Sequence, residues 1–163
     1  MQKVVTAAQM REIDRLTTER HAVPSLLLME AAANASARAV ASLLPEKFPD
    51  IRVLVLCGRG NNGGDGAALA RILWTAGAGV EVLLFGRVEE TRGDARTNFE
   101  STRQLAAADD SSRLRFHECP GGGGRWQETR AQLAGYAVVV DALFGTGLSC
   151  PLEGVFREAA AAL

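Results

Sequence analysis

A glycine-rich stretch, GRGNNGGDG at residues 58–66, constrains the fold of this chain more than any other feature. It follows the apolar run IRVLVLC and precedes AALARILWTAG, whose apolar residues have helical spacing. Such an apolar run is typical of a strand buried in a parallel sheet. A glycine loop that leads from a strand into a helix presents backbone N–H groups to an anion. The stretch therefore predicts an α/β fold with an anion-binding loop.

Strands and helices alternate along the rest of the chain. Apolar runs predict strands at 51–57, 80–85, 113–117 and 136–140, and periodicity predicts helices at 65–76, 91–107, 126–133 and 153–163. Four glycines at 121–124 predict a flexible surface turn, and Thr91 with Asp94 predicts a capping pair. A strand–helix repeat of this kind predicts a mainly parallel sheet with helices on both faces.

Two further helices are predicted before the first strand. Thr6 and Gln9 form a capping-box pattern that opens a helix through about residue 20. A second helix, 26–44, is so rich in leucine and alanine that we expect much of it to be buried, and prolines at 45 and 49 bracket the loop that follows. We predict one domain over residues 1–163. Because the chain stops in AAAAL without a glycine cap, we expect it to be truncated; a short terminal helix is the alternative.

Composition restricts the classes of protein to which the chain can belong. The formal net charge is −1, so we expect no nucleic-acid partner. No apolar run is long enough for a membrane span, so we expect no membrane partner either. The three cysteines, Cys57, Cys119 and Cys150, contain no C-x-x-C pair and suggest reduced thiols in the cytoplasm.

The polar residues of the glycine loop need an explanation beyond the backbone. In the common strand order the first and fourth strands flank the binding crevice, so GRGNNGGDG would face the segment that begins at Asp141. Asp65 has two interpretations, a cap for a helix beginning at Gly66 or a functional carboxylate. Amide and carboxylate oxygens of Asn61, Asn62 and Asp65 suit a hard cation. Asp141 ends an apolar strand, which favours an acid/base or a cation ligand over a solvated surface residue.

Two observations bear on the type of nucleotide. The second predicted strand ends in LLFGR with no acid for ribose hydroxyls, and Glu89 and Glu90 come late, which weakens the reading as an ordinary NAD-dependent oxidoreductase. The segment GTGLS at 145–149 is a second glycine-hydroxyl loop, either another anion cradle or a structural turn.

Three separated motifs, GNNGGDG, VVVDALFGTGLS and PLEG, together with AAQMREIDR and PSLLLME, resemble the NAD(P)H-hydrate epimerases, the YjeF N-terminal domain family. The resemblance covers essentially the whole chain. It implies a Rossmann-like three-layer α/β/α sandwich with two extra N-terminal helices, usually a homodimer. The implied activity interconverts the R and S epimers of hydrated NADH and NADPH, and an S-specific dehydratase, on a separate or the same chain, then restores the cofactor.

The resemblance also implies site residues. It assigns Asn62 and Asp141 to a potassium ion, and the implied reaction suggests that Asp141 transfers the proton, either instead of binding the cation or in addition to it. It assigns substrate contacts to Asn61, Asn62, Gly63, Gly64, Asp65, Gly145, Thr146, Gly147, Leu148, Ser149, Cys150 and Pro151. The chain departs from the family pattern at Arg59, Ala33 and Cys150, which stand where proline, glycine and arginine are common.

A non-catalytic binding module of the same fold is the alternative. Some relatives act as protein-interaction modules, and degenerate copies of this kind would be expected to lose GNNGGD or the strand-end aspartate. This chain keeps both, which favours the enzyme.

Overall fold

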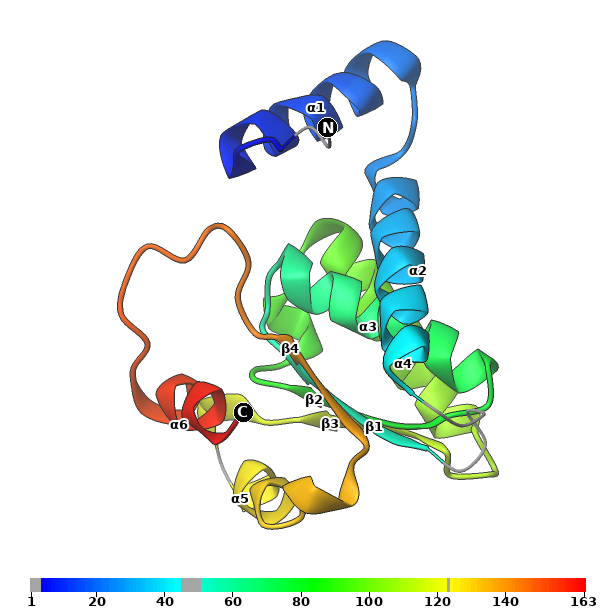
Figure 1. Cartoon of the computed structure of the whole chain (residues 1–163), viewed down its shortest axis with the longest axis vertical. Helices are drawn as coiled ribbons and strands as arrows, with labels where there is room; N and C mark the ends of the chain where they lie inside the picture. The colour runs from blue at the N-terminus through cyan, green and yellow to red at the C-terminus, as the bar shows by residue number, and fades with distance from the viewer. Residues whose placement is uncertain (1–3, 45–50, 123) are drawn as a thin grey trace.

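The computed structural model describes residues 4–44, 51–122 and 124–163 (Figure 1). The α-helices are α1 (Ala7–His21), α2 (Ser25–Leu43), α3 (Asn61–Thr75), α4 (Gly93–Ala108), α5 (Gly124–Arg130) and α6 (Gly154–Ala162). The strands are β1 (Arg52–Cys57), β2 (Gly79–Leu84), β3 (Leu114–Glu118) and β4 (Val138–Ala142). Short 3-10 turns occur at η2 (Val88–Glu90), η3 (Pro120–Gly122) and η4 (Leu133–Gly135). The predicted alternation of strands and helices is confirmed.

The sheet is parallel, with the order β3-β2-β1-β4. The chain moves outward from β1 to β2 and β3 on one side, and then returns to place β4 on the other side of β1. The strand order therefore reverses between β1 and β4, and in open α/β sheets ligands bind at such a point, beyond the carboxyl ends of the strands. The expected pairing of the first and fourth strands is confirmed.

Helices cover both faces of the sheet, as predicted. Alternate residues of β1 point to opposite faces: Val53 and Val55 pack with α2, α3 and α4, whereas Leu54 and Leu56 pack with α5 and α6. Figure 1 shows α2, α3 and α4 on one side of the sheet and α5 with α6 on the other. This arrangement is the predicted three-layer α/β/α sandwich with a parallel sheet and two added N-terminal helices.

The helix α2 is less buried than its leucine and alanine content predicts, and α1 is more exposed still. Only one face of α2 is buried, through Met29, Ala33, Ala37 and Val40, while Leu27 and Leu43 are 58% and 74% exposed. The helix α1 has no buried residue and stands apart from the sheet layers in Figure 1. Its predicted capping box is present, since the Gln9 amide N–H donates to Thr6 Oγ1 and the Thr6 N–H donates to Gln9 Oε1.

Several predicted boundaries and caps were wrong. The helix α3 begins at Asn61 rather than Asp65, and β4 runs from Val138 to Ala142, so that Asp141 lies inside the strand. The helix α4 begins at Gly93 with Arg92 as its N-cap, and the Thr91 hydroxyl donates to the Val88 carbonyl instead of capping that helix. The glycine run begins with the 3-10 turn η3, and its residue 123 lies outside the described residues, as does the loop predicted around residues 45–49.

None of the helices that the structure describes is both long and apolar enough to cross a lipid bilayer.

Candidate functional site

Two loops meet at the carboxyl ends of β1 and β4. The Gly58 N–H donates to the Ala142 carbonyl at 2.9 Å, continuing the pairing of the two strands into the loops. The Asn62 side chain then donates through Nδ2 to the Phe144 carbonyl at 3.1 Å. These contacts confirm that GRGNNGGDG and the loop after Asp141 lie side by side at the point where the strand order reverses.

Close backbone packing explains three of the glycines in the first loop. A Cβ atom on Gly58 would lie 1.8 Å from the Leu143 carbonyl oxygen, and one on Gly63 would lie 1.8 Å from the Gly58 carbonyl oxygen. A Cβ on Gly66 would lie 2.6 Å from the Ala142 Cβ. These glycines let α3 pack directly against the ends of β1 and β4.

The first turn of α3 is formed by the polar part of the loop. Gly60 is the N-cap and no side chain caps the helix. The Gly64 N–H donates to the Gly60 carbonyl, so the N–H groups of Asn61, Asn62 and Gly63 precede the first intrahelical bond. Helix N-termini with uncapped N–H groups bind anions such as phosphate. The site can therefore hold a phosphate group against α3.

Asn62 connects the two loops and keeps a potential ligand atom. Its amide nitrogen binds the Phe144 carbonyl, and a Cβ on Gly145 would lie only 3.3 Å from the Asn62 Cβ. Among the described residues, no hydrogen bond to Asn62 Oδ1 occurs. Asn61, its neighbour, is exposed. Of the two asparagines, Asn62 is thus the one that organises the site.

Asp65 is not a helix cap. It lies in the second turn of α3, and its side chain is half-buried, which excludes the capping interpretation. Burial, and to a lesser extent the negative charge of Asp14 on α1, raise the pKa of Asp65 to about 6. The carboxyl group can therefore gain or lose a proton near neutral pH.

The raised pKa makes the contribution of Asp65 to stability depend on pH. The folded chain keeps this proton up to about pH 6, while the unfolded chain releases it near pH 4, so the free energy of unfolding falls as the pH rises through this window. Asp65→Asn cannot ionise, so its stability relative to wild type is expected to rise by about 1 kcal/mol between pH 4 and pH 7, a value lowered by solvent screening. Urea unfolding at a series of pH values in potassium-free buffer measures this difference. Asp14→Asn should lower the pKa of Asp65 and so narrow the pH range over which stability changes. A stability difference between Asp65→Asn and wild type that does not change with pH would contradict the raised pKa of Asp65.

Asp141 lies on β4, in register with Leu56 of β1. Its Oδ1 accepts the Leu143 N–H at 2.9 Å, which holds the carboxylate beside its own backbone and leaves the second oxygen for other partners. The side chain is exposed, so the expectation that this position does not suit a solvated carboxylate was wrong. Among the described residues, β4 has a neighbouring strand on one side only. An exposed, anchored carboxylate beside two glycine loops can exchange protons with a bound ligand.

The second loop, residues 144–151, is exposed. All residues from 144 to 151 are exposed, and the Leu148 N–H donates to the Gly145 carbonyl at 3.3 Å. The helix α6 begins only at Gly154, so this loop does not lead directly into a helix as the first one does. Its predicted site residues are accessible to a ligand, and Cys150 carries an exposed free thiol.

The sequence patterns do not predict an ion pair between Arg59 and Glu90, which lies near the carboxyl ends of the strands. The turn η2 brings Glu90 back to the carboxyl end of β2, where its Oε2 accepts the Arg87 N–H and lies 3.3 Å from an Arg59 guanidinium nitrogen. The second strand therefore does have an acid near its end, although it is five residues further along the chain than Phe85. A cavity of about 250 Å³ adjoins this pair. Its lining residues are Arg59, Phe85, Gly86, Glu90, Cys119, Pro120, Gly121, Val155 and Phe156.

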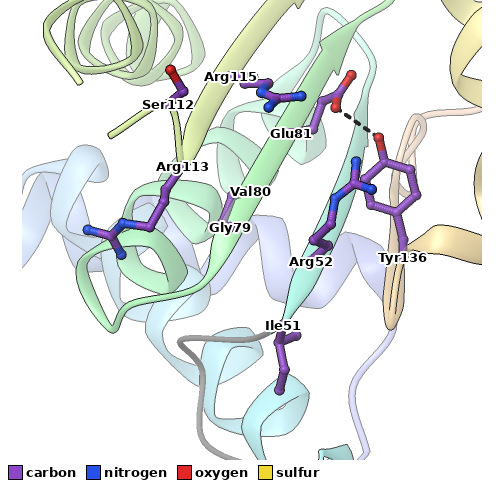
Figure 2. Close-up of a pocket in the computed structure, with 9 residues that line it drawn as sticks. All are labelled: Ile51, Arg52, Gly79, Val80, Glu81, Ser112, Arg113, Arg115 and Tyr136. Atoms are coloured by element: carbon purple, nitrogen blue, oxygen red, sulfur yellow. Dashed lines mark hydrogen bonds between the residues drawn. The ribbon is translucent and has the colours of Figure 1, made fainter. Parts of the chain in front are cut away.

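A second cavity, of about 240 Å³, lies near the amino-terminal ends of β1, β2 and β3, away from the two glycine loops (Figure 2). It is lined by Ile51, Arg52, Gly79, Val80, Glu81, Ser112, Arg113, Arg115 and Tyr136, none of which is a predicted site residue. Tyr136 and Arg125 both donate to the buried Glu81 carboxylate, at 2.8 and 2.7 Å. Figure 2 shows the side chains of Arg52, Arg113 and Arg115 pointing in different directions. They do not converge on an anion, and the cavity is not the candidate site.

The sequence of this chain is similar to those of known proteins. The family model for the YjeF-related protein N-terminus matches residues 25–163. The chain is 40% identical over 155 residues to the bifunctional NAD(P)H-hydrate repair enzyme Nnr of Moorella thermoacetica, covering 93% of the chain and 27% of that enzyme. It is 36% identical over 154 residues to the NAD(P)H-hydrate epimerase of Rhodopirellula baltica, covering 94% of the chain and 57% of that protein.

A solved structure has a fold similar to that of this chain. The crystal structure of yeast ynu0 matches with a TM-score of 0.75 and 27% identity, covering 99% of this chain and 64% of the yeast chain. The chain thus spans about a quarter of the length of the bifunctional relative and less than two thirds of the Rhodopirellula epimerase. It belongs to the family of YjeF-related protein N-termini.

Proposed function

We propose that this protein is an NAD(P)H-hydrate epimerase, which interconverts the R and S epimers of hydrated NADH and NADPH. The observation that carries the proposal is the junction of the two glycine loops beside the anchored carboxylate of Asp141, in a chain whose relatives bear that name. The first loop supplies N–H groups for a phosphate, and Asp141 supplies a proton-transfer group within the same crevice.

Substrate contacts are proposed for both loops. The first loop contributes the start of α3, through Asn61, Asn62, Gly63, Gly64 and Asp65. The second contributes Gly145, Thr146, Gly147, Leu148, Ser149, Cys150 and Pro151. The backbone of α3 would hold phosphate, while the exposed second loop would lie over the rest of the nucleotide.

The chemistry requires one bond to break and re-form. The hydrated ring carries its hydroxyl on the carbon next to the ring nitrogen, whose lone pair can expel that hydroxyl. A proton relayed through Asp141 would go to the departing oxygen, releasing water and leaving an iminium cation beside the carboxylate. Water would then add to either face of the ring, and its proton would return to Asp141. A proton transfer of this kind typically accelerates a reaction by about 10²–10⁴-fold.

A potassium ion is proposed at Asn62 and Asp141. Both residues offer oxygen atoms, which suit a hard cation, and each has one oxygen outside the hydrogen bonds that anchor its side chain. Within the described residues, no group of three or more His, Cys, Asp or Glu side chains could hold a metal ion. When bound, the ion would supply positive charge near the phosphate-binding loop.

Removing potassium is expected to slow epimer exchange several-fold, and adding it back to a tetramethylammonium buffer should restore the rate. Asn62→Ala should raise the potassium concentration needed for half-maximal activation by about tenfold, since it removes a ligand and the contact to Phe144. Gln104→Ala is the control for loss of a side-chain amide, because Gln104 is exposed on α4 and lies outside both loops. Exchange that is equally fast without potassium would exclude this site.

Partners and location are part of the same proposal. An S-specific dehydratase would use the product, in line with the bifunctional name of the Moorella relative. Exposed apolar side chains on the N-terminal part of the chain, Val5, Met10, Ile13 and Leu27, support a homodimer or larger homo-oligomer. The cysteines Cys57, Cys119 and Cys150 are free, which suits the cytoplasm.

The function is tested by the rate of exchange between purified R and S hydrated NADH. The protein in potassium buffer is expected to bring the epimers to equilibrium well before the spontaneous reaction does. Following both epimers by chromatography, with and without an S-specific dehydratase, measures this rate. A rate no higher than the spontaneous one would leave a binding module as the remaining interpretation.

A further inference from the structure

A residue of α1, near the start of the chain, contacts the second glycine loop, near its end. Arg11 donates from Nη1 to the hydroxyl of Thr146 in the second loop at 3.2 Å. This contact joins residues 135 positions apart, although α1 buries none of its side chains. The helix is connected to α2 through Ala22, whose left-handed backbone ends α1, and Pro24. The hydrogen bond to Thr146 thus joins α1 to the second loop, while no buried residue of α1 fixes the helix there.

A second side chain of α1 faces the same site. Asp14 lies three residues after Arg11, so the two share one side of the helix. The charge of Asp14 contributes to the raised pKa of Asp65 in the first loop. Arg11 thus contacts the second loop, and the charge of Asp14 on the same side of the helix acts on Asp65 of the first loop.

The site has few other cations. No Lys, Arg or His occurs between Arg130 and Arg157, so the second loop carries no positive charge of its own. Arg59 in the first loop is paired with Glu90. Among the described residues, no carboxylate lies within ion-pair distance of Arg11, while Arg15 on the next turn binds Glu12 and Glu19. Among the described residues, Arg11, like Arg87 and Arg92 after β2, makes no ion pair with an acid, and Arg11 is the one of the three that contacts the second loop.

We propose that Arg11 is a further substrate-binding residue, whose guanidinium binds a phosphate oxygen of the nucleotide held between the glycine loops. The proposal rests on the proposed function for the identity of the nucleotide. A guanidinium binds phosphate through paired, charge-assisted hydrogen bonds, which are stronger than its bond to a neutral hydroxyl. A phosphate can therefore replace Thr146 as the partner of Arg11.

This contact would also order α1. The free helix has no buried side chain and is held by weak, solvent-exposed contacts, so little free energy opposes its movement. Binding of phosphate by both Arg11 and the α3 N-terminus would fix α1 beside the two glycine loops.

The test uses Arg11→Gln and Arg11→Lys, with Arg20→Gln as the matched control. Arg20 lies nine residues from Arg11, half a turn round the helix, and so points away from the loops. Affinity for ADP-ribose, which carries the pyrophosphate without the nicotinamide ring, is measured by calorimetry at two salt concentrations. KM and kcat for epimer exchange and the melting temperature are measured in parallel.

Arg11→Gln is expected to weaken ADP-ribose binding by roughly 10- to 100-fold and to raise KM similarly, with kcat changed much less. Arg11→Lys should recover part of the affinity, the salt dependence should be smaller for Arg11→Gln, and Arg20→Gln should match wild type. If wild type catalyses no exchange but Arg11→Gln still loses ADP-ribose binding, the proposed function fails and the role of Arg11 stands. Unchanged affinity in Arg11→Gln, or no ADP-ribose binding by wild type, overturns it.

Discussion

Asp141→Asn is expected to slow epimer exchange by about 10²–10⁴-fold while leaving the protein folded. The asparagine Oδ1 can still accept the Leu143 N–H, so the substitution removes the proton-transfer group but keeps the local turn. Asp141→Ala removes both and is expected to abolish exchange. Because Asp141 is exposed and its one hydrogen bond is local, neither variant should lower the free energy of unfolding by more than about 1 kcal/mol.

The matched control for charge is Asp110→Asn, an exposed aspartate in the turn before β3, which is expected to exchange epimers at the wild-type rate. Exchange rates are measured at saturating substrate and potassium, together with urea unfolding. If Asp141→Asn keeps wild-type activity, proton transfer belongs to another group, and Asp65 with its raised pKa is the next candidate.

Gly63→Ala is expected to destabilise the protein by more than about 4 kcal/mol, or to prevent folding altogether. Its new Cβ would lie 1.8 Å from the Gly58 carbonyl oxygen, a backbone atom that cannot move without displacing the end of β1. Relief of this contact requires α3 to move away from the sheet, and the crevice between the loops would be lost with it.

Gly60→Ala is the control in the same loop. Nothing lies within 4 Å of a Cβ at Gly60, and its φ of −92° suits alanine, so its free energy of unfolding should stay within about 1 kcal/mol of wild type. Urea unfolding, or soluble yield where Gly63→Ala does not fold, compares the two variants. Equal stability of both would mean that the loop does not pack as the structure shows.

Much of the fold could be predicted because the relevant interactions are local. The apolar run of β1, the alternation of strand and helix patterns, and the capping box at Thr6 each depend on residues within one element or its ends. The parallel sheet and the juxtaposition of β1 with β4 then follow from general rules of chain connection. Asn62 and Asp141 were singled out through the resemblance of GNNGGDG and VVVDALFGTGLS to the epimerase family, and their roles are proposals.

Errors arose where local patterns compete with packing. Aspartate is a common helix cap, but α3 begins four residues before Asp65 because Gly63 and Gly66 allow it to approach the ends of β1 and β4. Leucine and alanine suggested a buried α2, but only the side of that helix formed by Met29, Ala33 and their neighbours meets the core.

The amino-acid pattern alone was sufficient for the α/β class, the position of the glycine loops and the carboxylate between them, since each is encoded by neighbouring residues. Three features could be known only from the folded chain: the ion pair of Glu90 with Arg59, the exposure of Asp141, and the contact of Arg11 with Thr146. The two contacts join residues 31 and 135 positions apart. No periodicity or local motif encodes which distant side chains meet once the helices and the sheet have packed.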